Sequence, residues 1–284
     1  MTRTARRTAS AAALAATAAL LLAACAPAAG EAEPQPEATE SLYVTEGKLT
    51  IATGEPAYFP YVIDDDPTTG EGFEAAVAYA IAEELGFAPE DVVWVRTSFE
   101  AAIQPGPKDF DFNLQQYTIT EERAENVDFS SPYYATPQAV ITVESSPAAS
   151  ATSLAELSDF LVGAATGTTS FTAIEEQIAP TAGAQAFNTN DDAVLALQNG
   201  TVDAIVVDLP TAFFLTAVVL DGGVLLGQLP ADAGVSDEWG LVLAKDSPLT
   251  PVVTAAVDAL RESGRLDEIA AQWLGADAGA PILQ

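Results

Sequence analysis

TITEERAENVDFSSPYY, residues 118–134, sets an arginine where helix physics disfavours a cation. Thr120 has the side chain of a helix N-cap, and Glu121 and Glu122 follow it in the first turn. Carboxylates suit the positive end of a helix dipole, whereas a guanidinium does not. Arg123 therefore either pairs with a nearby carboxylate on the surface or receives an anion beside the helix N-terminus. The local sequence leaves both interpretations open.

Composition excludes several classes of function. The chain has 284 residues, with 41 Asp and Glu against 10 Lys and Arg, and contains no histidine. Its formal net charge of -31 repels phosphate backbones, so we expect no nucleic-acid partner. Without histidine, Ser/His/Asp and Cys/His nucleophilic schemes are excluded. Ordinary zinc sites are excluded as well, because the chain has no histidine and its one cysteine is Cys25. No phosphate-binding glycine loop is present, and we expect no cofactor and no metal.

The N-terminus has the pattern of a lipoprotein signal peptide, residues 1–25. Three arginines precede an apolar run, residues 11–24, that is too short to span a bilayer as a mature helix. The run ends in LAAC, so we expect Cys25 to carry lipid and to hold the protein at the extracytoplasmic face of the cell membrane. An ordinary signal peptide with a chance cysteine is the alternative. Residues 26–46, rich in Ala, Pro and Glu, are predicted to form a disordered tether.

Strand and helix signals alternate from residue 48 onward. Alternating or continuous apolar runs predict strands at 48–53, 92–96, 109–114, 160–164, 204–207 and 239–244. Helical periodicity, caps and a proline predict helices at 73–85, from about 171, at 190–200, from 210, and at 248–263 and 266–274. Such a βαβ pattern predicts an α/β fold, and its length favours two lobes.

The opening stretch resembles the solute-binding proteins of amino-acid ABC importers, the family of the bacterial glutamine-, histidine- and lysine/arginine-binding proteins. Members carry a T-x-T-x-x-R run followed by D-F-S-x-x-Y-Y, which here is Thr118, Thr120, Arg123, Asp128, Phe129, Ser130, Tyr133 and Tyr134. The resemblance extends over about residues 48–275. It implies a periplasmic-binding-protein type II fold with two α/β lobes joined by two hinge crossings. Lobe 1 would comprise 47–137 and 238–284, lobe 2 would comprise 138–237, and the crossings would lie near 137–143 and 235–241.

The resemblance also implies a cleft that holds an α-amino acid at both of its charges. Arg123 and the Thr118 hydroxyl match the family's carboxylate-binding residues in one lobe. Thr169, in a Gly-Thr-Thr turn, would add backbone donors from the other lobe, although a plain strand-to-helix connection is the alternative. Asp208 matches the ammonium-binding aspartate at a strand end, helped by the Gln116 carbonyl. Its alternative role is to cap the helix that Pro210 opens.

Other matching positions concern the ligand's side chain. Tyr58 and Phe99 would stack on it, with core packing as the alternative. Glu55 would reach a polar or cationic group, and Trp239 would close one wall. Gln115 and Gln116 replace small residues that the family commonly has, and Ala165 replaces its frequent Lys or Gln. The two amides would narrow the pocket and favour polar ligands, whereas Glu55 and Asp208 favour a cationic or amide side chain.

These features predict a monomeric, lipid-anchored solute-binding protein that captures a polar amino acid and delivers it to an ABC permease, without a catalytic residue. A periplasmic cyclohexadienyl or arogenate dehydratase on the same fold is one alternative, with Glu55 or Asp208 as general acid. A sensor subunit that reports the ligand to a membrane receptor is another.

Overall fold

The structure is a computed structural model that describes residues 41–230, 237–275 and 279–284. The predicted signal peptide with Cys25, and the predicted tether up to residue 40, lie outside the described residues. Over the described ranges, no helix is both long enough and apolar enough to cross a bilayer.

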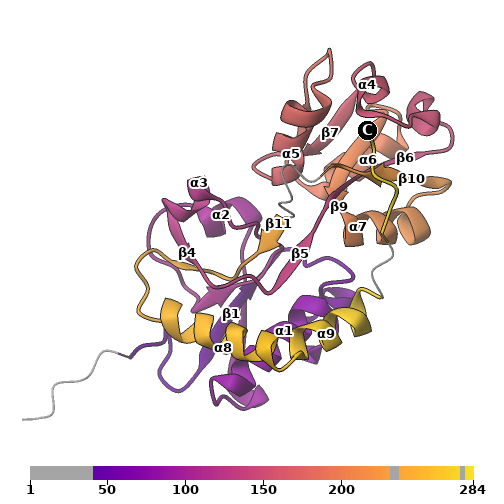
Figure 1. Ribbon diagram of the computed structural model, residues 1–284. Coiled ribbons are helices and arrows are strands. Elements are labelled where there is room, and N and C mark those ends of the chain that lie inside the picture. The colour runs from indigo at the N-terminus through magenta and orange to yellow at the C-terminus, as the bar shows by residue number, and fades with distance from the viewer. Residues whose placement is uncertain (1–40, 231–236, 276–278) are drawn as a thin grey trace, which may run out of the picture. The chain divides into compact units, whose positions relative to one another are not determined.

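The first lobe is built on a five-stranded mixed sheet (Figure 1). In sheet order its strands are β2 (Val92–Arg96), β1 (Leu49–Thr53), β3 (Phe112–Asn113), β12 (Val242–Ala244) and β4 (Val127–Phe129). β1 runs parallel to β2 and β3, whereas β12 runs antiparallel to β3 and β4. Two short helices, α2 (Phe99–Ile103) and α3 (Glu121–Ala124), follow strands of this sheet.

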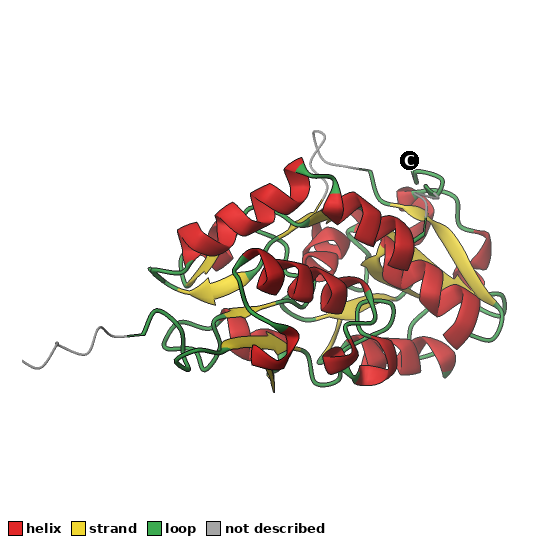
Figure 2. Cartoon of the chain, turned by 90° about the horizontal axis from the view of Figure 1, so that it is seen from below, coloured by secondary structure: helices red, strands yellow, loops and turns green. Residues whose placement is uncertain are grey.

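Three longer helices cover the first sheet: α1 (Phe73–Glu84), α8 (Thr250–Glu262) and α9 (Arg265–Trp273). Seen from below, they form a layer in front of the strands (Figure 2). In α1 the residues Phe73, Val77 and Ile81 recur on one helical face and are fully buried in the core that β1 and α8 share. Gly86 ends this helix with a φ of 83°, which suits glycine and agrees with the predicted stop.

The second lobe is built on another five-stranded sheet. Its strands, in order, are β10 (Gly223–Gln228), β6 (Gln138–Val143), β9 (Ala204–Asp208), β7 (Val162–Ala165) and β8 (Gln185–Phe187). Its helices are α4 (Leu154–Leu157), α5 (Thr169–Ala173), α6 (Asn190–Gln198) and α7 (Leu209–Phe214), and π-helical turns at Ile174–Ile178 and Leu215–Val219 extend α5 and α7. Short 3-10 turns occur at Ile63–Asp65, Pro67–Thr69, Pro89–Asp91 and Pro147–Ser150. Separate apolar clusters lie on the two faces of this sheet, so helices cover both sides.

Two antiparallel strands, β5 (Tyr134–Thr136) and β11 (Asp237–Trp239), pair where the chain passes between the lobes. The two-lobed α/β architecture is therefore confirmed. One crossing was expected near residues 137–143, but most of this segment is β6, which is buried along its whole length inside the second sheet. The chain crosses earlier, at β5. The single strand predicted at 239–244 is divided at Gly240, where a Cβ would lie 2.8 Å from Cγ1 of Ile119.

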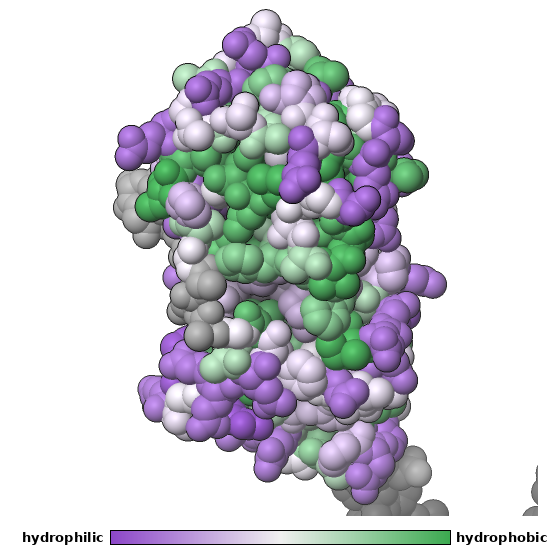
Figure 3. Space-filling view, turned by 90° about the vertical axis from the view of Figure 1, so that its right-hand side faces the viewer, coloured by the Kyte–Doolittle hydropathy of each residue, from purple (hydrophilic) through white to green (hydrophobic). Residues whose placement is uncertain are grey.

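The last residues depart from the predicted lobe assignment. Residues 281–284, expected in lobe 1, lie on the second sheet: the Gln228 amide donates to the Pro281 carbonyl at 2.8 Å, and the Leu283 amide donates to the Gln228 carbonyl at 2.9 Å. Leu283 is 2% exposed, because its side chain fills part of the second lobe's core. In the space-filling view, apolar side chains gather over the upper lobe (Figure 3). Among the described residues, Val218 and Ile282 are large apolar side chains that are exposed.

Candidate functional site

A cavity of about 390 Å³ is lined by residues of both lobes. The structure brings into it all of the predicted contact residues except Trp239: Glu55, Tyr58, Phe99, Gln115, Gln116, Thr118, Arg123, Thr169 and Asp208. Glu74, Glu100, Ser170 and the segment 188–190 also line it. The residues come from loops and helix starts that follow strand ends, which is where open α/β sheets place their ligands.

Trp239 belongs to the core of the first lobe. Its side chain is 0% exposed, and its ring centroid lies 5.6 Å from that of Tyr61 and 5.2 Å from that of Tyr134. The structure therefore places the side chain of Trp239, the last residue of β11, in the core of the first lobe and not at a cavity wall.

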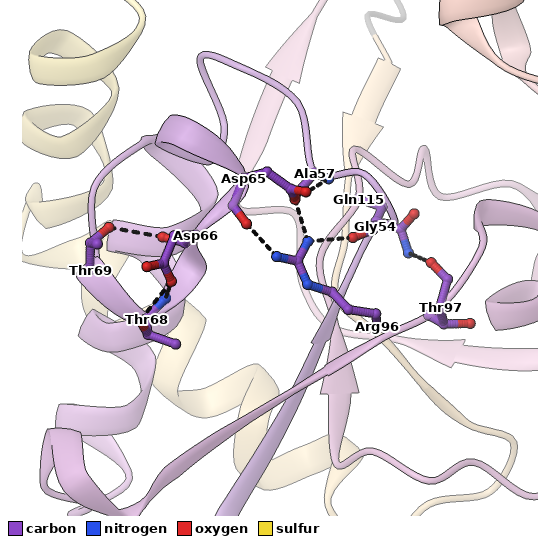
Figure 4. A network of polar contacts seen from close by, with 9 residues as sticks. All are labelled: Gly54, Ala57, Asp65, Asp66, Thr68, Thr69, Arg96, Thr97 and Gln115. Atoms are coloured by element: carbon purple, nitrogen blue, oxygen red, sulfur yellow. Dashed lines mark hydrogen bonds and ion pairs between the residues drawn. The ribbon is translucent and has the colours of Figure 1, made fainter.

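A loop after β1 carries Glu55 and Tyr58 to the cavity, and Arg96 at the end of β2 holds this loop (Figure 4). Arg96 Nη1 donates to the Gly54 carbonyl at 2.7 Å and to Asp65 Oδ1 at 2.6 Å, and Nη2 donates to the Asp65 carbonyl. One guanidinium thus ties both ends of the loop together. Sequence reasoning missed Arg96, which there appears only as a basic residue at the end of a strand.

Arg123 points into the cleft. Thr120 caps α3 as predicted, with its Oγ1 accepting from the Arg123 amide at 3.2 Å. Because α3 has only four residues, Arg123 also lies in its last turn, so the expected conflict with the helix dipole is small. The side chain is 8% exposed and forms no ion pair with any described residue, which contradicts the surface-pairing interpretation.

The Arg123 guanidinium reaches across the cleft. Nη1 donates to the Thr118 carbonyl at 2.7 Å, and Nη2 donates to the Gly167 carbonyl of the second lobe at 2.9 Å. Its Cζ lies 5.3 Å from the ring centroid of Phe99, within cation–π range. Burial lowers the pKa of Arg123, but an arginine stays protonated in proteins.

On the opposite side of the cleft, the Gly-Thr-Thr turn opens α5. Thr168 is its N-cap and accepts from the Phe171 amide at 3.2 Å. Thr169 is the first helical residue, and its hydroxyl lies 3.3 Å from that of Thr118 and 2.7 Å from Oδ2 of Asp237.

Asp208 ends β9 and stands at the N-cap position of α7, yet its side chain makes no capping hydrogen bond. Its Oδ1 instead accepts from Nε2 of Gln138 at 2.6 Å. Burial, followed by the nearby Asp237 carboxylate, raises the pKa of Asp208 to about 8. Gln138 and Asp237 escaped sequence reasoning because only the crossing strands bring them to this place.

Glu74, in the first turn of α1, is a further buried acid that sequence reasoning missed. It is 2% exposed and accepts hydrogen bonds from the Gln116 amide at 2.7 Å, from Gln116 Nε2 and from the Tyr133 hydroxyl. Burial raises its pKa to about 7. An acid at the start of a helix is ordinary in sequence, so nothing there distinguished it.

Comparisons with known proteins show what this chain is similar to. A family model described as bacterial extracellular solute-binding proteins, family 3, matches residues 49–276. The chain is 29% identical over 231 residues to the L-arginine-binding protein of Pseudomonas aeruginosa, covering 78% of this chain and 86% of that protein. It is 28% identical over 218 residues to the ABC transporter glutamine-binding protein GlnH of Bacillus subtilis, covering 75% and 76%. Among solved structures, an ancestral amino-acid-binding protein, a precursor of cyclohexadienyl dehydratase, superposes with a TM-score of 0.65 at 29% identity, covering 80% of this chain and 95% of that chain.

Proposed function

Because the chain belongs to the bacterial extracellular solute-binding proteins of family 3, we propose that it captures a polar amino acid between its lobes and delivers it to an ABC permease. One observation carries this proposal: a buried guanidinium, Arg123, and a carboxyl group, Asp208, contribute to one cavity from opposite lobes. A free amino acid has one negative and one positive group, and each needs a partner when water is removed. The relatives named for arginine and glutamine support an amino-acid ligand.

In this proposal Arg123 binds the ligand's carboxylate. A guanidinium has five N–H donors, and hydrogen bonds to Thr118 and Gly167 engage only two of its nitrogens, so donors remain for a carboxylate. The Thr118 hydroxyl and the Thr169 amide at the start of α5 stand beside it. Ligand contacts to both lobes would favour the closed form, since only contacts that differ between the two forms shift their populations.

Asp208 binds the ammonium group, and Tyr58 and Phe99 flank the side chain. Among the described residues, the charged ones that line the cavity are the acids Glu55, Glu74, Glu100 and Asp208 and one base, Arg123. An excess of acids complements a positive or hydrogen-donating side chain better than a negative one. We therefore assign a cationic or amide amino acid as the ligand class.

The cellular setting completes the proposal. The protein acts as a monomer on the outer face of the cell membrane, anchored by lipid on Cys25 and joined to it by the tether. Cys25→Ser would move the protein from the membrane fraction to the soluble fraction, whereas an unchanged distribution would refute the anchor.

A thermal-shift panel of the common amino acids tests the binding function. A ligand that binds only the native state raises the melting temperature. We expect a cationic or amide amino acid to do so for the wild type and for Arg265→Ala, an exposed arginine paired with Glu268, but not for Arg123→Ala. An equal ligand-induced shift in Arg123→Ala would contradict the assignment.

A dehydratase remains the second candidate, because a buried carboxyl group with a raised pKa is what a general acid requires. Asp208 fits that role better than Glu55, which is exposed. Incubation with prephenate or arogenate separates the two functions: product formation that Asp208→Asn abolishes would favour the enzyme. A role as a sensor subunit would be indicated by a receptor gene beside this one in place of permease genes.

A further inference from the structure

Gln138, the first residue of β6, joins two acids that come from different strands. Its Nε2 donates to Oδ1 of Asp208 at 2.6 Å and to Oδ2 of Asp237 on β11. Its Oε1 accepts from the Ser170 hydroxyl, which leaves the amide without freedom to turn. The two carboxyl groups share one nitrogen, so they lie within two hydrogen-bond lengths of each other.

Few groups compensate the charge of this pair. Asp237 also accepts from the Thr169 hydroxyl at 2.7 Å. Near Asp208, the carboxyl group of Glu74 adds a further acid. The Tyr61 hydroxyl also lies near Asp208, but it is hydrogen-bonded to Thr211 Oγ1 at 2.8 Å and carries no positive charge.

Arg123 is the one cation whose charge acts on Asp208 among the described residues, but it binds carbonyl oxygens and forms no ion pair with either acid. Two close carboxylates without a cation between them favour retention of a proton.

We propose that Asp208, Gln138 and Asp237 form a proton-linked ammonium site. In the empty cavity the acid pair holds one proton, and the arriving ammonium group displaces it to solvent, so that each binding event exchanges one positive charge for another. Asp208 contacts the ligand, whereas Gln138 and Asp237 are positioning residues that act through it. The inference rests on the proposed function, because the ligand must bring an ammonium group.

The chain is unusually suited to show such an exchange. It contains no histidine, so besides Asp208 and Glu74, whose pKa is about 7, few side chains titrate near neutral pH. The raised pKa of Asp208, about 8, places the exchange in that range. With such a pKa, affinity should increase about tenfold from pH 6 to pH 7, because deprotonation before binding costs less as the pH rises.

Isothermal titration calorimetry of the mature protein in phosphate and in Tris at pH 7 tests the proposal, with L-arginine and L-glutamine as probes. The dependence of heat on buffer should report release of close to one proton per ligand in the wild type. Asp237→Asn should release distinctly less and should flatten the change of affinity between pH 6 and pH 7. A merely structural role of Asp237 would weaken binding and leave proton release unchanged.

Glu84→Gln, an exposed acid at the end of α1 that is not among the residues lining the cavity, should retain the release and serves as the control. Binding without proton release in the wild type would overturn the inference and leave the proposed function standing. Failure of every common amino acid to bind would overturn both. If Asp237→Asn does not fold, the wild-type proton count and pH dependence still decide the matter.

Discussion

Glu74 should make the stability of the ligand-free protein depend on pH. Its pKa is raised by burial from an ordinary value of 4.5 to about 7. Between these values the unfolded chain has lost the proton and the folded chain keeps it, so the folded state binds more protons. Stability is therefore highest on the acidic side and falls as the pH rises through this window. The difference between the two pKa values corresponds to about 3 kcal/mol of unfolding free energy.

Glu74→Gln retains the size of the side chain and removes the titration. Urea denaturation at pH 5, 6, 7 and 8 should show that the unfolding free energy of the wild type falls by about 2.5 kcal/mol more than that of the variant, because at pH 5 part of the effect has already been lost. Asp208 and Asp111, whose pKa values burial also raises, contribute to the slope left in the variant. Glu84→Gln, an exposed acid at the end of α1, is the matched control and should follow the wild type. Parallel curves for the wild type and Glu74→Gln would refute the reasoning.

Three further predictions concern packing. Trp239→Ala should lower the unfolding free energy by about 3 to 5 kcal/mol, because it empties a fully buried site; unchanged urea denaturation would contradict this. Phe99→Leu removes the ring next to the Arg123 guanidinium and should weaken amino-acid binding about two- to tenfold in calorimetry; equal affinity would mean that the ring contributes nothing. Deletion of residues 281–284 exposes the site of Leu283 and should lower the melting temperature, and a value equal to that of the wild type would show that this contact adds no stability.

The long elements with a regular apolar pattern were predictable from the sequence. The extent of the short strands was not, because it depends on which distant segments they pair with. Helix α1 and strands β1 and β2 lie within a residue or so of their predicted ranges, because each has an unbroken apolar pattern. The alternation at 109–114 predicted a full strand, but only Phe112–Asn113 pairs with its neighbours. Short strands such as β5 and β11 have no signal of their own, because they form only where two distant segments meet.

The candidate site also contains residues that the sequence predicted and residues that it did not. Motif resemblance identified Arg123 and Asp208, which stand at a helix start and a strand end that local sequence marks. Gln138 and Asp237, which contact Asp208 or its partner, were not predictable, because they are 99 positions apart and meet only in the folded chain. Glu74 was not predictable for another reason. Residues distant in sequence bury this first-turn acid, and the burial raises its pKa to about 7.

The C-terminal segment on the second sheet forms a further covalent connection between the lobes. α9 ends in the first lobe, and the chain becomes attached to Gln228 at Pro281. From Leu274 to Pro281 the chain has a contour length on the order of 25 Å, since a residue spans at most about 3.5 Å. Where this segment joins the lobes, α9 and Gln228 cannot move further apart than this contour length unless Leu283 leaves its buried site. In the proposed opening and closing of the lobes about β5 and β11, this connection would limit the separation of the lobes from a point distant in sequence from those strands.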